Sequence, residues 1–177
     1  GRGQANPSSM KAAIDLAKNM TELPRHPKYN HLGRGGSARY GRTRLFEALY
    51  RFEMWGQMLE MTGSAFLEPT DVETEQVKRL RARGIALLHL NRAAEIKPIV
   101  ADLTKRLAKV TKLRDKAAAD ADAKAKKEKK KAKDIKKAVD AAKRTFSTRV
   151  SVVEKALNEL NGFAAIQKGD KEAGIKL

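Results

Sequence analysis

Residues 99–161 read IVADLTKRLAKVTKLRDKAAADADAKAKKEKKKAKDIKKAVDAAKRTFSTRVSVVEKALNELN and contain no Gly or Pro over 63 positions. Gly and Pro are the strongest local breakers of regular structure, and the segment is otherwise rich in good helix formers such as Ala, Lys, Leu and Glu. We therefore predict a helix of about 60 residues. At about 1.5 Å per residue, such a helix would reach roughly 95 Å.

Each end of this segment carries an apolar seam, in which apolar residues recur every three or four positions. Such spacing is typical of helices that pack along their length. The first seam consists of Ile96, Val100, Leu103, Leu107 and Val110. The second consists of Ile135, Val139, Ala142, Phe146, Val150, Val153, Leu157 and Leu160. We expect the seams, in residues 96–110 and 135–160, to bind neighbouring proteins of a large assembly.

The middle of the segment is strongly basic, because residues 123–137 hold nine lysines against Glu128 and Asp134. Two shapes fit this pattern. A continuous rod is favoured, because no turn residue marks the middle. An antiparallel hairpin that turns within residues 117–131 is the alternative, because it would let the two seams bury each other.

The remaining sequence predicts an all-α protein in which a small helical cluster precedes the long helix. Residues 1–23 form an N-terminal arm and first helix, and Pro24 ends that helix. Residues 45–97 form an aromatic-rich helical core, whose first helix spans residues 44–62 and is capped by Thr43. Residues 98–161 form the long lysine-rich helix. Gly162 stops it, and residues 162–177 form an extended tail.

Between the first helix and the core, residues 24–44 read PRHPKYNHLGRGGSARYGRTR and hold six cations, four glycines and no acid. Such a segment cannot bury a core of its own, whereas arginines can bind phosphate oxygens and tyrosine rings can stack on exposed bases. We predict a basic RNA-binding loop here. Its predicted contact residues are Arg25, Lys28, Tyr29, Arg34, Arg39, Tyr40, Arg42 and Arg44.

The basic middle of the long helix supplies the second set of predicted RNA contacts. These residues are Lys124, Lys126, Lys127, Lys130, Lys131, Lys133 and Lys137. The whole chain carries a formal net charge of +17 and has a sequence pI of about 10.2. A charge of this size is typical of proteins that bind polyanions.

Motifs of catalysis are missing from the sequence. There is no Cys for a thiol mechanism, and His26, His31 and His89 do not have the spacing of a metal site. We expect no enzymatic activity, no cofactor and no metal. No apolar run approaches the ~18 residues that span a bilayer, so we expect no transmembrane segment.

One short resemblance occurs in the predicted core. The tripeptide Leu49-Tyr50-Arg51 is similar to the signature of the small mitochondrial LYR-motif helical proteins, which dock acyl carrier protein in respiratory and iron–sulfur assembly. The similarity covers three residues in a helix that is not the first one. No functional residue is carried over from it.

The sequence therefore predicts a non-catalytic RNA-binding protein of a large ribonucleoprotein, with ribosomal RNA as partner and a mitochondrial or other organellar ribosome as its setting. The chain begins with Gly-Arg-Gly and not with Met, which favours a removed targeting peptide or a tag. One alternative is an accessory structural subunit of a mitochondrial membrane complex, such as the ATP synthase or respiratory complex I. A second alternative is a histone-like DNA-binding protein.

Overall fold

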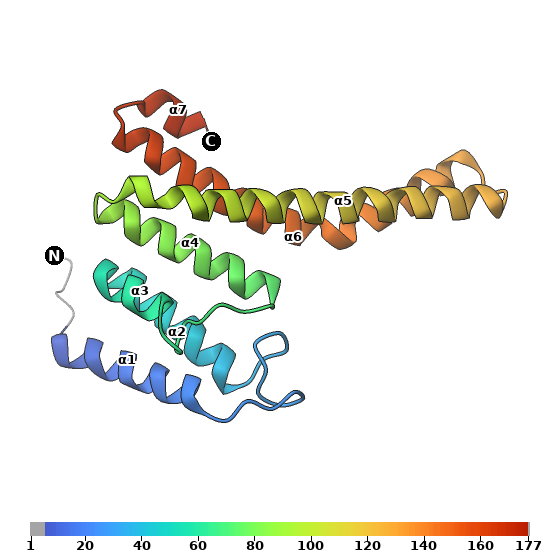
Figure 1. The fold of residues 1–177 in the computed structure, drawn as a ribbon. Coiled ribbons are helices and arrows are strands. Elements are labelled where there is room, and N and C mark those ends of the chain that lie inside the picture. Colours follow the sequence, from blue (N-terminus) through green and yellow to red (C-terminus); the bar gives the residue numbers. More distant parts are fainter. Residues whose placement is uncertain (1–5, 177) are drawn as a thin grey trace. The chain divides into compact units, whose positions relative to one another are not determined.

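The computed structural model describes residues 6–176, and the chain divides into two compact units, residues 1–96 and 97–177. Between residues 6 and 176 the regular structure is helical, which confirms the all-α prediction, and no strand is formed there. Each unit is described by itself below, with the helices labelled as in Figure 1.

The first unit holds four α-helices and one 3₁₀ turn. The helices are α1 (Pro7–Glu22), α2 (Ser37–Arg51), α3 (Trp55–Thr62) and α4 (Glu73–His89), and the 3₁₀ turn η1 spans Ala93–Ile96. Their buried core includes Ile14, Leu45, Leu49, Met58 and Leu67. Helices α1 and α2 approach closely at Gly41, because a Cβ atom there would lie 2.6 Å from the carbonyl oxygen of Ala17. The first unit is thus a set of short helices around one apolar core.

The predicted helix over residues 44–62 is wrong at its start and in its middle. Helix α2 already begins at Ser37, so the predicted basic loop over residues 24–44 is a loop only as far as residue 36. The chain then leaves the helix after Arg51, where Glu53 adopts the left-handed conformation with φ 53°. The amide of Met54 donates to the carbonyl of Leu49 (2.9 Å), which closes the C-terminal turn of α2.

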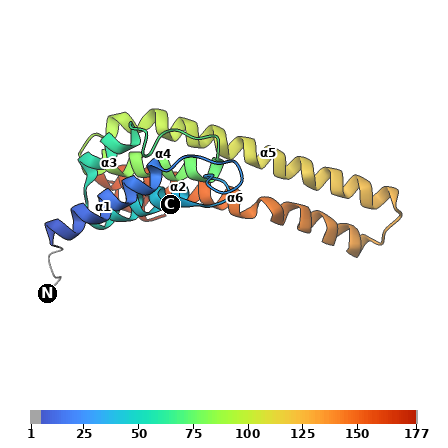
Figure 2. The same ribbon diagram turned by 90° about the horizontal axis from the view of Figure 1, so that it is seen from below.

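The second unit is a helical hairpin, so the preference for a continuous rod is wrong and the alternative is correct. Helix α5 (Lys97–Lys127) and helix α6 (Ala132–Gln167) run antiparallel side by side, as Figures 1 and 2 show. Because both helices pack against each other, the two apolar seams are engaged inside the chain. The seam residues of α5 and α6 that are buried are Leu103, Val110, Val150, Val153, Leu157 and Leu160.

The turn of the hairpin contains neither Gly nor Pro. Lys129 takes the left-handed position with φ 53°, the amide of Lys130 donates to the carbonyl of Ala125 (3.1 Å), and that of Lys129 donates to Lys126 (2.9 Å). This pair of bonds is the Schellman pattern that ends many helices, usually with Gly in the left-handed place. Sequence reasoning missed the turn because a lysine occupies that place. Burial of the apolar seams offsets the conformational cost.

The predicted stop at Gly162 and the predicted extended tail over residues 162–177 are also wrong. Helix α6 continues through Gly162 to Gln167, and a short helix α7 (Lys171–Lys176) packs back on it. A Cβ atom on Gly174 would lie 2.8 Å from the carbonyl oxygen of Gly162, so the two helices touch through their glycines. Gly169, with φ 90°, is the residue that ends α6.

Candidate nucleic-acid interface

The end of the hairpin gathers nine lysines, and we call this group the lysine tip. Three belong to the last turns of α5, three to the turn and three to the first turns of α6: Lys124, Lys126, Lys127, Lys129, Lys130, Lys131, Lys133, Lys136 and Lys137. All nine are exposed. In a rod they would spread along a helix, whereas the hairpin turn collects them at one end of the unit (Figure 2).

Few carboxylates neutralise the lysine tip. Lys126 pairs with Asp122 (2.7 Å) and Lys130 with Glu128 (2.8 Å). The hydrogen bond from Lys130 lowers the pKa of Glu128 below its ordinary value, and the same bond raises the pKa of Lys130. The seven other lysines form no ion pair within residues 6–176. The nine lysines of the tip therefore outnumber the carboxylates that pair with them, and the tip carries a large positive charge.

The structure brings all seven predicted contact residues of the long segment to the lysine tip. Lys129 and Lys136 belong to the same exposed group, although the prediction from sequence left them out. All nine lysines lie within 14 consecutive residues at the turn end of the hairpin.

The loop before α2 is folded and not an extended strand of chain. Two isolated antiparallel bridges join His26 to Asn30 and His31 to Gly35. The Asn30 amide nitrogen donates to the carbonyl oxygen of Pro24 (2.8 Å), and its side-chain oxygen accepts from the amide of Ala38 (2.8 Å). Because these bonds fix the loop against α2, the loop is a defined surface.

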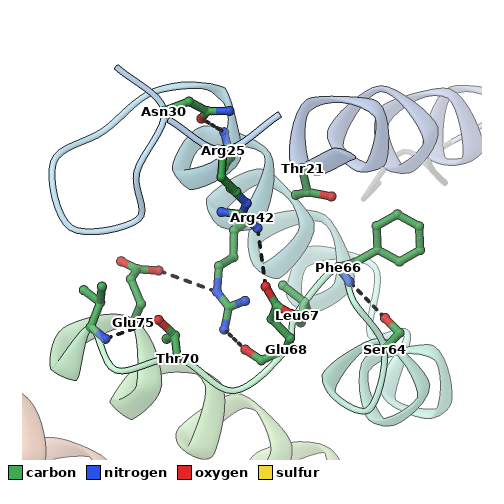
Figure 3. A network of polar contacts seen from close by, with 12 residues as sticks. Thr21, Arg25, Asn30, Arg42, Ser64, Phe66, Leu67, Glu68, Thr70 and Glu75 are labelled. Atoms are coloured by element: carbon green, nitrogen blue, oxygen red, sulfur yellow. Dashed lines mark hydrogen bonds and ion pairs between the residues drawn. The ribbon is translucent and has the colours of Figure 1, made fainter. Parts of the chain in front are cut away.

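Arg42 is a correction to the predicted contact residues, because its side chain is fully buried (0% exposed). Its Nη2 donates to the carbonyl oxygen of Glu68 (2.8 Å), and its Nε lies 3.9 Å from the Glu75 carboxylate, as Figure 3 shows. Burial lowers the pKa of Arg42 to about 10, although the charge of Glu75 opposes that shift. Arg42 therefore belongs to the interior of the first unit and offers no donor to a nucleic acid.

Three further predicted arginines pair with carboxylates that lie outside the acid-free segment 24–44. Arg25 pairs with Glu68 (3.7 Å; Figure 3), Arg39 lies 3.9 Å from Glu75, and Arg44 pairs with Glu47 (2.7 Å). The segment has no acid of its own, but the fold brings acids to it. The net charge of the loop surface is consequently smaller than the sequence suggests.

Tyr29 and Tyr40 expose most of their side chains, as stacking on bases requires, with relative exposures of 69% and 62%. The ring of Tyr29 stacks on His26 with centroids 4.8 Å apart, and the ammonium of Lys28 lies 5.2 Å from the same ring. Arg34 is exposed as well. Four predicted contact residues are therefore accessible on the surface: Lys28, Tyr29, Arg34 and Tyr40.

Sequence reasoning missed Glu75, which the fold makes the centre of a buried charge cluster. Its side chain is 1% exposed and is contacted by Lys78 (2.8 Å), Arg39 and Arg42 (both 3.9 Å). No local signal in the sequence marks it, because its partners lie on α2 and on the next turn of α4. One carboxylate thus faces three cations.

Comparison with protein-family models, with curated proteins and with solved structures gave no match for this chain. Across residues 6–176, no helix combines the length and the apolar character needed to cross a membrane. No group of three or more potential metal ligands occurs in the same range. The lysine tip and the loop before α2 are the candidate interfaces considered below.

Proposed function

We propose that the protein is a non-catalytic RNA-binding component of a ribonucleoprotein, and that it contacts RNA through the lysine tip. The observation that carries the proposal is the collection of nine exposed lysines at one end of a helical hairpin, with two local ion pairs. Like charges held this close repel one another. A polyanion that neutralises them lowers the free energy of the hairpin.

The mechanism is charge neutralisation with counterion release. Each phosphate that is neutralised releases condensed cations, so the logarithm of the binding constant falls linearly with the logarithm of the salt concentration. If about five lysines of the tip contact duplex RNA, the slope is about −4 to −5. This electrostatic term carries no sequence information, and a rigid hairpin serves to place the charge between RNA segments.

RNA is proposed as the polyanion because of the loop before α2, where the exposed rings of Tyr29 and Tyr40 lie among cationic residues. Unstacked bases of single-stranded RNA offer faces on which such rings stack. The organellar ribosome stays a prediction from the sequence, as does the mitochondrial location.

The test is the salt dependence of RNA binding, measured by fluorescence anisotropy with a labelled duplex. The tip variant replaces four lysines of the tip by Gln: Lys127, Lys130, Lys131 and Lys133. The matched control replaces four exposed lysines elsewhere in the second unit: Lys105, Lys109, Lys155 and Lys168. Both variants have the same net charge. We expect the tip variant to reduce the magnitude of the slope by about 3 to 4 and the control by less than about 1.

Equal losses in the two variants would show that total charge and not the lysine tip drives binding. The two alternatives from the sequence have their own readouts. Equal affinity for duplex DNA and duplex RNA would favour a histone-like protein. Retention on the native particle after ribonuclease treatment would favour a subunit of a mitochondrial membrane complex.

A further inference from the structure

A second cationic surface lies in the first unit, at a hollow of about 420 Å³ that we call the basic pocket. Its lining residues come from the end of the loop, from the first turns of α2 and from α4: Arg34, Gly35, Arg39, Tyr40, Thr43 and Lys78. Lys78 is far from the others in sequence and is brought to them by the fold. The volume lies within the range of about 300–1,000 Å³ that is typical of ligand sites.

The side chains that line the basic pocket have unused hydrogen-bond donors. Arg39 approaches Glu75 only to 3.9 Å, which is beyond hydrogen-bond distance, and Lys78 contacts that carboxylate at 2.8 Å. Arg34 forms no ion pair in the described part of the chain. The hydroxyl of Thr43 makes no hydrogen bond there either. The Arg34 guanidinium and the Thr43 hydroxyl therefore have open donors, and the Arg39 guanidinium faces Glu75 at 3.9 Å without a hydrogen bond to it.

The charges around the basic pocket favour an anion. Among the described residues, Glu75 is the carboxylate that forms ion pairs with Arg39, Arg42 and Lys78, so a single negative charge faces three cations there. Glu75 is 1% exposed, and Lys78 holds one of its oxygens at 2.8 Å. Arg34 adds a further positive charge at the rim.

The backbone adds to the same attraction. Helix α2 has 15 residues and begins at Ser37; its N-cap Gly36 has no side chain, and the Asn30 side-chain oxygen accepts from the amide of Ala38 in the first turn. The first turn of a helix carries a partial positive charge and attracts anions. Since Arg39 and Tyr40 of this turn line the basic pocket, the helix dipole and the side chains act on the same space.

We propose that the basic pocket binds the phosphomonoester group of a nucleotide and that the ring of Tyr40 stacks on the base. A phosphomonoester carries about −1.5 to −2 charges at pH 7, which matches several cations better than a singly charged diester does. A guanidinium binds such a group with two parallel hydrogen bonds. Tyr40 is 62% exposed at the rim, so its ring face is available. The proposal does not depend on RNA binding at the lysine tip.

Calorimetry on the full chain with adenosine 5′-monophosphate, adenosine and inorganic phosphate tests the proposal. We expect the monophosphate to bind about tenfold more tightly than inorganic phosphate, because stacking on an aromatic ring adds affinity, and adenosine to bind undetectably. The backbone amide resonances of Gly35 and Arg39 should shift during the same titration. Adenosine that binds as tightly as its monophosphate would overturn the phosphate site.

Substitutions then separate the parts of the basic pocket. Arg34→Gln should weaken monophosphate binding about tenfold, whereas Lys28→Gln, which removes an exposed cation of the same loop outside the pocket, should change it less than twofold. Arg39→Lys keeps the charge but loses the paired donors, so we expect a similar tenfold loss. Tyr40→Ala should reduce monophosphate affinity to that of inorganic phosphate and leave phosphate binding unchanged. No effect of Arg34→Gln or Arg39→Lys would refute the assignment.

The nucleotide can be free or can be the 5′ end of an RNA, and a pair of oligonucleotides distinguishes these sources. An RNA end is the source if a 5′-phosphorylated single strand binds the wild-type protein more tightly than its 5′-hydroxyl counterpart, and if Arg34→Gln removes the difference. Equal binding of both strands, with monophosphate binding retained, indicates a free nucleotide. In the tip variant, monophosphate binding should persist even if RNA affinity is lost; its loss there would overturn the location in the basic pocket.

Discussion

Replacing Glu75 with Gln tests whether the buried charge cluster holds the first unit together. The carboxylate of Glu75 is 1% exposed and lies 3.9 Å from the guanidinium of Arg42, which is itself fully buried. Gln preserves the size and shape of the side chain and removes only its charge. Arg42 then remains in the interior without a carboxylate beside it.

The structure gives the expected magnitude. Two unit charges 3.9 Å apart attract each other by about 4 kcal/mol at an effective dielectric constant of ~20. Burial lowers the pKa of Arg42 to about 10 even while Glu75 is present, so the cation is already disfavoured by desolvation. Breaking a buried pair from one side costs about 3–5 kcal/mol. We expect Glu75→Gln to lower the free energy of unfolding of the first unit by that amount and to lower the pKa of Arg42 further.

Urea denaturation followed by tryptophan fluorescence measures this loss. Trp55 is the one tryptophan of the chain and stacks on His89 with centroids 4.0 Å apart, so its emission reports the first unit. Glu68→Gln is the matched control, because the Glu68 side chain is 51% exposed and pairs with Arg25 at 3.7 Å. We expect the control to cost less than about 1 kcal/mol. A loss below about 1 kcal/mol for Glu75→Gln would refute the reasoning.

Three further predictions address the turn, the helix contact and the tip. Lys129→Gly should stabilise the hairpin by about 1 kcal/mol, since Gly adopts the left-handed conformation without the penalty of a Cβ atom, and hydrogen exchange near the turn should slow about fivefold; unchanged exchange would contradict the Schellman assignment. Gly41→Ala should lower the free energy of unfolding, measured by urea denaturation, by about 1–3 kcal/mol, because its Cβ atom would meet the backbone of α1. Gly56 faces open space, so Gly56→Ala should leave stability unchanged or raise it. Equal effects of the two substitutions would argue against the close approach of α1 and α2. The ion pair with Lys130 lowers the pKa of Glu128. The pair therefore stabilises the tip at pH values above the ordinary pKa of Glu, and this stabilisation is lost as the pH falls through the lowered pKa. Lys130→Gln should raise the pKa of Glu128 in an NMR titration, and an unchanged pKa would exclude this pair.

The helix ends show where sequence reasoning fails in this protein. The three non-glycine residues with positive φ are Glu53, Asn91 and Lys129 in the described chain, and each follows the end of a helix. The left-handed conformation costs a residue with a Cβ atom about 1–2 kcal/mol, so local propensity does not predict it at Glu or Lys. Packing of the flanking helices supplies more than this amount, and that packing is not visible in a local sequence window.

Two glycines that local propensity places at helix ends or in loops lie inside helices. Gly162 is part of the interior of α6, since α7 returns to pack on that point and a Cβ atom on Gly174 would meet its carbonyl. Gly41 likewise lies inside a helix where α1 comes close. In both places the missing Cβ serves contact between helices. The sequence alone does not distinguish a glycine at a contact between helices from a glycine that ends a helix.

By itself, the sequence determined that the chain is helical, that apolar seams mark both ends of residues 96–160 and that nine lysines lie between the seams. These features follow from residue type and spacing, which act over a few residues. The tertiary structure alone decided that the seams face each other, that the lysines meet at a hairpin turn and that Arg42 is buried beside Glu75. Each of these outcomes depends on free energy from groups distant in sequence: apolar burial along two helices in the first two cases, and a carboxylate 33 positions away, on α4, in the third.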